Sequence, residues 1–329
     1  MARRNIDFLA KEVYIPHCVM LTLLVIKVPN GLELLWEGDL RDDRIKYLFI
    51  WPAFLVVLAV GIFPLIYTLV VSFQSIRITP PMPPRFVGFD NYTNLLASAR
   101  FWGAITTTSA IVFISVVVQY VVGFGLALAL HNNVPGERLY RPLFLFPMFM
   151  APVAVALVSR MIFNSSLGPV NDLATFLGFP NLPFLTQARW AISVIATVEI
   201  WQWTPFVTLL MLAGLQSLPR EVFEAAMIEN ASPWQRFWGI TFPMMLPLSV
   251  AVVFIRIIES FKIVDTVFVL TGGGPGTSTE TLTLFAYNEG FKKFNIGQAS
   301  ALSFLFLIVI TLFGVIYLAL ARPFVEKRT

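Results

Sequence analysis

Residues 298–321 read QASALSFLFLIVITLFGVIYLALA and contain no charged side chain. A membrane hydrocarbon core about 30 Å thick is crossed by roughly 20 apolar residues in an α-helix, so this stretch predicts a membrane-spanning helix. Five further stretches satisfy the same criterion, at about 48–73, 104–130, 142–163, 190–216 and 244–260. The sequence therefore predicts an all-α integral membrane protein with six spans, whose spanning domain covers residues 48–321.

Prolines interrupt two of these stretches. Pro142, Pro147 and Pro152 fall within the third, and Pro243 and Pro247 lie at the start of the fifth. Proline lacks the N–H of a helical hydrogen bond and clashes with the preceding turn. We therefore expect kinks in the third span and displaced ends in both.

The composition excludes a water-soluble globule. Of the 329 residues, 57% are hydrophobic and 13% are charged, against roughly 25% charged in a typical soluble domain. The basic residues are scattered through the loops and form no dense patch, which argues against a nucleic-acid partner. Membrane lipid is therefore the expected surrounding of much of the chain.

Few residues are available for catalysis or metal binding. Cys18 is the only cysteine, and His17 and His131 are the only histidines, which disfavours thiolate clusters, zinc sites and catalytic triads. The glycine-rich run 272–276 is not followed by the Lys-Ser/Thr of a P-loop, and no Gly-Lys pair occurs in the sequence. We expect no enzyme, no metal site and no cofactor in this chain. If ATP drives the protein, another subunit binds the nucleotide.

The N-terminal extension, residues 1–47, is harder to interpret. The segment 13–28 is apolar but short for a span, and it contains Pro16, His17 and Lys27. It also lacks the small-residue cleavage site of a signal peptide. A cytoplasmic or membrane-surface helix is the favoured interpretation. A seventh span and a misassigned start codon are the alternatives.

The distribution of basic residues predicts the orientation. With six spans, residues 1–47 share a side with the loops 131–141 and 217–243 and with the tail 322–329, and these segments hold fourteen Lys and Arg. The loops on the other side hold seven over the same number of residues. Cytoplasmic loops are enriched in Lys and Arg. Both termini are therefore expected in the cytoplasm.

The cytoplasmic loop 217–243 has helix signals of its own. Pro219 suits the first turn of a helix, and Asn230 tolerates the left-handed conformation that ends one. Ser232, Pro233 and Gln235 then supply an N-cap, a proline at the first helical position and a capping-box partner. The pattern predicts two short helices joined by a hinge.

The same loop carries residues at a fixed spacing that resembles the EAA loop of permease subunits of bacterial ATP-binding cassette importers. That pattern reads EAAxxDGAxxxxxFxxIxxPxxxP. Glu229 stands where the family usually has Asp, and Asn230 where it usually has Gly. The matching residues are Glu224, Ala225, Ala226, Ala231, Phe237, Ile240, Pro243 and Pro247.

Two further stretches resemble the carbohydrate-importing branch, which includes maltose, trehalose and glycerol-phosphate permeases. Arg256 to Asp265, followed by Leu270 to Pro275, is similar to RxxDxFRxFD and LTxGGP. The stretch from Val87 to Tyr92 is similar to a segment that follows the first span in that branch. The resemblance covers about residues 48–321 and leaves the N-terminal extension unexplained.

The resemblance implies the six-helix bundle of a type I importer permease with a cytoplasmic coupling helix. Two EAA-type permeases form the pathway, two ATPase subunits bind Mg-ATP beneath them, and a periplasmic or lipid-anchored binding protein delivers the sugar. The location is the bacterial inner membrane. The coupling residues are Glu224, Ala225, Ala226, Glu229, Asn230 and Ala231, the two alanines allowing close approach to the ATPase. An ordinary amphipathic loop helix without a partner is the alternative.

Charged residues inside the spans require partners, since a charge at a helix centre costs at least roughly 2.5–3.5 kcal/mol on insertion. Arg256 and Glu259 are three residues apart on one helical face, so we expect an ion pair between them, direct ligand contact being the alternative. Glu199 has no partner within its own helix. Lys262 and Asp265, nearer the outer end, are expected to pair as a structural gate.

Glu199, Trp203 and Phe206 stand at i, i+4 and i+7, which places a carboxylate and two aromatic rings on one helical stripe. A sugar site combines partners for hydroxyls with aromatic faces for the C–H side of the ring. Trp201 and Trp203 belong to an interfacial aromatic belt in the alternative interpretation. The predicted substrate cavity comprises Glu199, Gln202, Trp203, Phe206, Arg256, Glu259 and Ser260.

Two other functions compete with the permease of an ATP-driven sugar importer. A proton-coupled secondary sugar transporter would use Glu199 as its titrating group, but inverted repeats are not evident and the EAA loop would stay unexplained. An integral membrane enzyme lacks a nucleophile and base. The sequence leaves open whether the sugar is neutral or an anion held by Arg256.

Overall fold

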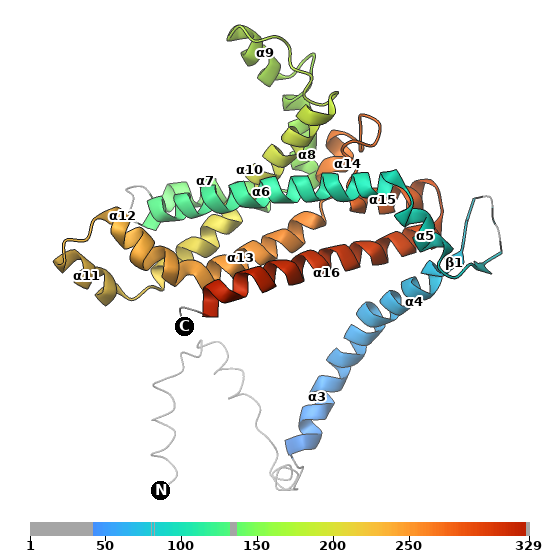
Figure 1. Cartoon of the computed structure of the whole chain (residues 1–329), viewed down its shortest axis with the longest axis horizontal. Helices are drawn as coiled ribbons and strands as arrows, with labels where there is room; N and C mark the ends of the chain where they lie inside the picture. The colour runs from blue at the N-terminus through green and yellow to red at the C-terminus, as the bar shows by residue number, and fades with distance from the viewer. Residues whose placement is uncertain (1–41, 80, 82, 132–136, 327–329) are drawn as a thin grey trace, which may run out of the picture. The chain divides into compact units, whose positions relative to one another are not determined.

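The computed structural model describes residues 42–79, 81, 83–131 and 137–326 (Figure 1). The interpretations of residues 1–41 as a surface helix or an additional span therefore lie outside the described residues. The chain divides into two units, residues 1–64 and 65–329, each considered by itself. The described part of the first contains α3 (Asp42–Val57), the π-helix η2 (Leu58–Ile62) and the start of α4 (Phe63–Ser72).

Within the described residues, five helices are long and apolar enough to cross a membrane. A sixth span is obtained if a pair of helices bent by 100° counts as one. This matches the six predicted stretches. The long helices of the second unit are α6 (Ala99–His131), α10 (Ala188–Gln216), α13 (Phe242–Phe261) and α16 (Ile296–Glu326).

The bent pair is the predicted third span. It consists of α7 (Glu137–Phe149) and α8 (Pro152–Ile162), and Ala151 between them is extended, with φ −61° and ψ 131°. A residue that precedes proline is pushed out of the helical region by the proline ring. Pro152 therefore breaks the helix here, as the sequence predicted, whereas α7 continues through Pro142 and Pro147.

The fifth span begins earlier than predicted. The helix Pro233–Phe261 is continuous through α12 (Pro233–Arg236), the π-helix η3 (Phe237–Thr241) and α13. Prolines inside membrane helices are accommodated by local adjustments such as π turns, which satisfy the freed backbone groups elsewhere. The π turn of η3 lies just before Pro243. The backbone hydrogen-bond pattern therefore changes near this proline, and the helix continues past it.

Short elements connect the long helices. Strand β1 (Gln74–Ser75) pairs antiparallel with β2 (Arg85–Phe86), Gln74 lying opposite Phe86. The loop that leads from the fourth to the fifth span contains α11 (Arg220–Ile228). The remaining short helices are α5 (Asp90–Leu96), α9 (Pro169–Phe176), α14 (Asp265–Leu270), α15 (Leu282–Tyr287) and the π-helix η4 (Asn288–Lys292).

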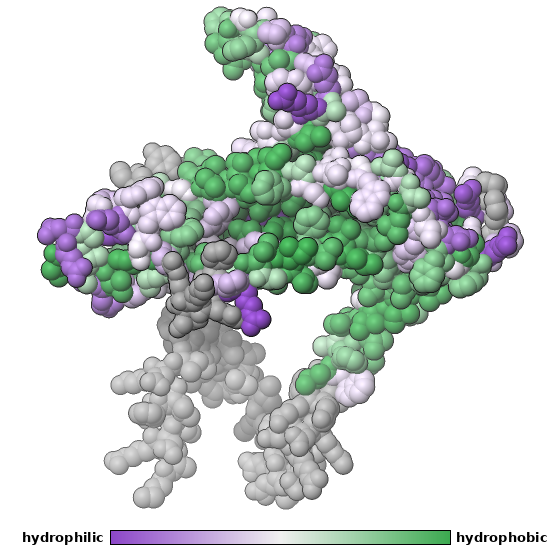
Figure 2. Space-filling view, viewed as in Figure 1, coloured by the Kyte–Doolittle hydropathy of each residue, from purple (hydrophilic) through white to green (hydrophobic). Residues whose placement is uncertain are grey.

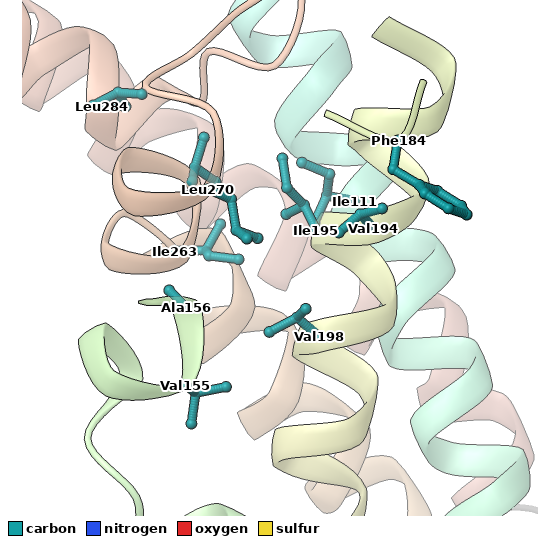
Figure 3. Close-up of a cluster of buried hydrophobic side chains, with 11 residues drawn as sticks. Ile111, Val155, Ala156, Phe184, Val194, Ile195, Val198, Ile263, Leu270 and Leu284 are labelled. Carbon is teal, nitrogen blue, oxygen red and sulfur yellow. The ribbon is translucent and has the colours of Figure 1, made fainter. Parts of the chain in front are cut away.

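Helix α10 is the centre of the second unit. In its most apolar stretch 61% of the residues are buried, against 11% for α16. It approaches α6 so closely that a Cβ added at Gly123 would lie 2.9 Å from Cβ of Val207. Figure 3 shows its side chains Val194, Ile195 and Val198 in one buried cluster with residues of α6, α8 and α14.

The two ends of the long helices differ in character. α11 and α12 lie at one end, and β1, α5 and α15 lie at the other (Figure 1). Figure 2 shows hydrophobic side chains over the middle of these helices and hydrophilic ones gathered toward the ends. This distribution is what a membrane environment requires of helices whose outward faces are not covered by protein.

An ion-pair cluster ties the first turn of α6 to the segment before α16. Nε and Nη2 of Arg100 each lie 2.7 Å from an oxygen of Glu280, and Nη1 lies 2.8 Å from Oε1 of Glu289. Both glutamates are buried, and Asn288 donates a further hydrogen bond to Glu280. A bidentate arginine with this many partners holds the helix ends in one arrangement.

Candidate functional site

A buried polar cluster joins α6, α10 and α13. Nη2 of Arg256 lies 2.8 Å from Oε1 of Glu199, and both side chains are buried. The same Nη2 donates to Oγ of Ser260 at 2.9 Å, and Nε donates to Oε1 of Gln119 at 2.9 Å. The amide of Gln119 also donates to the backbone oxygen of Glu199 at 2.9 Å. The cluster thus links three helices through one arginine.

The predicted ion pair between Arg256 and Glu259 is wrong. Arg256 pairs with Glu199 of α10, whereas Glu259 lies 2.7 Å from Nζ of Lys262 in a half-exposed pair. This also corrects the expected pairing of Lys262 with Asp265. Sequence spacing reveals only neighbours on the same helix, whereas the packing of α10 on α13 brings the buried carboxylate of Glu199 to Arg256.

The structure separates Phe206 from the other two residues of the predicted stripe, Glu199 and Trp203. The guanidinium of Arg256 lies over the ring of Trp203, 4.9 Å from its centroid, a cation–π arrangement. Trp203 and Phe206 are both partly buried, but only Trp203 lines the pocket next to the cluster. Glu199 and Trp203 therefore line the same pocket, and Phe206 lies outside it.

A pocket of about 140 Å³ opens beside the cluster. Gln202 is buried in its wall and donates from Nε2 to the backbone oxygen of Met150 at 3.1 Å, at the break between α7 and α8. Its Oε1 is buried without a hydrogen-bond partner. The lining residues are Pro152, Glu199, Gln202, Trp203, Arg256, Glu259, Lys262, Ile263, Val264, Asp265 and Thr266.

The predicted cavity missed several residues of this region, among them Gln119, Lys262, Asp265 and Thr266. Gln119 is fully buried and bridges Arg256 to α10, and Thr266 lines the pocket. A signal for Gln119 was present, since it is the only amide side chain in the apolar stretch 104–130. Polar side chains in membrane helices generally face other helices. Ser260, by contrast, was predicted for the cavity and holds Arg256 instead.

The loop between the fourth and fifth spans has the predicted short helix and hinge, but the second helix is not short, since it begins the continuous helix Pro233–Phe261. α11 ends before Asn230, whose φ of 55° is left-handed. Ser232 accepts from the backbone N–H of Gln235, and the side chain of Gln235 accepts from the N–H of Ser232, which completes the capping box. Pro219 stands one position before α11 instead of within its first turn.

Ala225 and Ala226 face different surroundings on α11. Ala226 is buried at 8% exposure, whereas Ala225 and Glu224 are exposed. Adjacent residues on a helix point about 100° apart, because a turn contains 3.6 residues. Ala226 is therefore covered within this chain, and the outward face carries Ala225 and Ile228, the latter 82% exposed. Contact of both alanines with a partner stays a prediction.

The predicted coupling residues cluster around the hinge. The N–H groups of Glu229, Asn230 and Ala231 donate to carbonyls of α11, so these residues close the end of that helix. A pocket of about 850 Å³ lies between α11, η3 and the end of α6. Glu224 lines it together with the basic residues His131, Arg220 and Arg236.

Neither the polar cluster nor the loop offers a metal site. Among the described residues, no three or more His, Cys, Asp or Glu side chains are grouped so that they could hold a metal ion.

The sequence of this chain is similar to those of known transport proteins. Residues 119–328 match the family model described as binding-protein-dependent transport system inner membrane component. The trehalose/maltose transport system permease protein of Thermococcus litoralis is 33% identical over 283 residues, covering 86% of this chain and 95% of that protein. The trehalose transport system permease protein of Mycobacterium tuberculosis is 31% identical over 281 residues, covering 85% and 90%.

The fold comparison agrees. A crystal structure of a bacterial alginate ABC transporter, in complex with an alginate pentasaccharide-bound periplasmic protein, contains a chain that matches with a TM-score of 0.77. The match covers 88% of this chain and 97% of that chain at 21% identity. The chain therefore has the fold of that transporter chain.

Proposed function

The chain belongs to the family of binding-protein-dependent transport system inner membrane components, and we propose that it forms half of the translocation pathway of an ATP-driven sugar importer. The observation that carries this proposal is the family match over residues 119–328, which includes both the polar pocket and the loop around α11. The relatives named above are sugar permeases. The proton-coupled alternative is not favoured by any of these findings.

The polar pocket is proposed as part of the sugar pathway. It combines carboxylates and an amide, which bond hydroxyl groups, with the ring of Trp203. Polar groups of this kind fix the orientation of a hydroxylated ligand, and aromatic faces pack against its C–H side. The chain itself performs no chemistry in this proposal. It alternates between outward-open and inward-open arrangements of its helices.

The energy for this alternation comes from partner subunits. α11 is proposed as the coupling helix, its exposed face with Glu224, Ala225 and Ile228 contacting an ATPase that binds Mg-ATP. Glu229, Asn230 and Ala231 form the hinge that transmits the movement to the fifth span. A second EAA-type permease completes the pathway. A periplasmic or lipid-anchored binding protein delivers the sugar, as the periplasmic protein of the alginate transporter's structure suggests.

The proposed orientation places both termini and α11 on the cytoplasmic face of the bacterial inner membrane, because that side has the higher density of Lys and Arg. After replacement of Cys18, single cysteines at Ser98 and Thr277 should react with a membrane-impermeant thiol reagent added to intact cells. A cysteine at Ser232 should react only after the membrane is opened. Labelling of the cysteine at position 232 in intact cells would show that this loop faces outward and would contradict the proposed orientation.

Reconstitution tests the proposed function. The chain, its partner permease and the ATPase are placed in proteoliposomes with the loaded binding protein outside and ATP inside. Uptake of a sugar such as trehalose or maltose should require both ATP and the binding protein and should be unaffected when a proton gradient is collapsed. Uptake that follows the proton gradient in the absence of ATP would contradict the proposal and support the secondary transporter.

A further inference from the structure

Arg256 lines the pocket, and its Nε and Nη2 are both occupied by hydrogen bonds within the chain. Three of its hydrogen bonds go to Gln119, Glu199 and Ser260, and the whole side chain is 2% exposed. Its positive charge is matched by Glu199 at 2.8 Å. An arginine that recognises an anionic ligand presents a free, two-pronged face to it. Arg256 instead positions Glu199 and the neighbouring helices.

The other cation of the pocket is also matched. Nζ of Lys262 lies 2.7 Å from Oε1 of Glu259, and both side chains are about half exposed. Asp265 lines the same pocket and forms no ion pair within the part of the chain that the structure describes. The lining thus contains two ion pairs and one additional carboxylate, so its formal charge is negative.

The pocket contains acceptors that have no partner among the described residues. Oε1 of Gln202 has no hydrogen-bond partner, and the residue is only 1% exposed. Carboxylates are also acceptors only, when ionised. Such groups bond to O–H donors, which a sugar supplies in number. A carboxylate or phosphate on the ligand would place another acceptor, with a negative charge, against the negatively charged pocket. The resulting repulsion would discriminate against such a ligand.

We propose that this pocket selects uncharged, hydroxyl-rich sugars and rejects sugar acids and sugar phosphates, with Gln202 accepting from a substrate hydroxyl and Asp265 supplying the repulsion. The inference rests on the proposed function, that a sugar occupies the pocket. The sequence left open whether the sugar is neutral or an anion held by Arg256. The inference answers this question, because the charge of Arg256 is neutralised by Glu199, which lies on a helix distant in sequence.

Binding to the purified complex of both permeases and the ATPase, without the binding protein, tests this selectivity directly. Two matched pairs of probes differ mainly in charge: maltitol with maltobionate, which share the same open chain, and trehalose with trehalose 6-phosphate. Each neutral sugar should bind at least tenfold more tightly than its charged counterpart, as measured by calorimetric titration. Asp265→Asn should narrow this ratio at least threefold, and Asp265→Glu should retain it.

Asp172→Asn is the matched control, since Asp172 is an exposed acidic residue on α9 outside the pocket, and it should leave the ratio unchanged. Binding of the charged member within threefold of the neutral one would overturn the inference while leaving the sugar-importer function intact. A neutral preference that Asp265→Asn does not alter would overturn the role of Asp265. Failure of every sugar to bind would contradict the proposed pathway, and the inference would fall with it.

Discussion

Replacing Arg256 by Met should be among the most damaging single changes in this chain. The substitution leaves the carboxylate of Glu199 buried without its cation, and breaking a buried pair in this way costs about 3–5 kcal/mol. The bonds to Gln119 and Ser260 disappear as well. The purified complex should show a markedly lower apparent melting temperature in detergent and should accumulate poorly in the membrane.

The double variant Arg256→Met, Glu199→Gln separates charge from packing. Because it removes both charges, much of the lost stability should return. Lys262→Met is the matched control for loss of a cation. Its partner Glu259 is half exposed, so the cost should stay below about 1 kcal/mol. A double variant no more stable than Arg256→Met alone would show that the two residues are not energetically coupled.

Ala225→Arg should abolish coupling to the ATPase. Ala225 lies on the exposed face of α11, so a long charged side chain can be accommodated in the isolated chain. In a close helix contact with a partner, overpacking alone costs roughly 1–3 kcal/mol, and tenfold weaker binding corresponds to about 1.4 kcal/mol. Capture of the ATPase and ATP hydrolysis stimulated by the loaded binding protein should therefore fall together, by tenfold or more.

Two further variants sharpen this test. Ala97→Arg introduces the same side chain at an exposed alanine after α5, at the other end of the long helices, and should retain the ATPase. Ala226→Arg is less informative than its sequence position implied, because Ala226 is buried within the chain and the change should lower the stability of the loop itself. Normal stimulation in the Ala225→Arg variant would exclude this face of α11 as the coupling surface.

The hinge shows how far local sequence determines local structure. Asn230 and the capping box of Ser232 and Gln235 were predicted from residue types alone, and the structure confirms both. These features depend on neighbours within a few residues, so the sequence contains all the partners involved. The extended residue before Pro152 belongs to the same class, since the proline ring next to it is sufficient cause.

The predicted site was less complete because its contacts are not local. Glu199 and Arg256 were both identified as charges that need partners, yet the expected partner of Arg256 was Glu259 on the same helix. Nothing in the spacing reveals that Gln119, in a helix more than one hundred residues away, would occupy Nε of Arg256. Likewise, a stripe of residues 199, 203 and 206 predicts one face but not which neighbour covers each position.

The sequence by itself determined the membrane-spanning architecture, the approximate spans, the helix–hinge–helix loop and the family, because hydrophobic length, proline chemistry and capping act over short distances. Only the tertiary structure decided which charges neutralise each other, which alanine of α11 faces outward, and that the side-chain oxygen of Gln202 is buried without a partner. These depend on how α6, α10 and α13 rotate and approach one another. In a low-dielectric interior that approach, measured in a few ångströms, decides which ion pair forms.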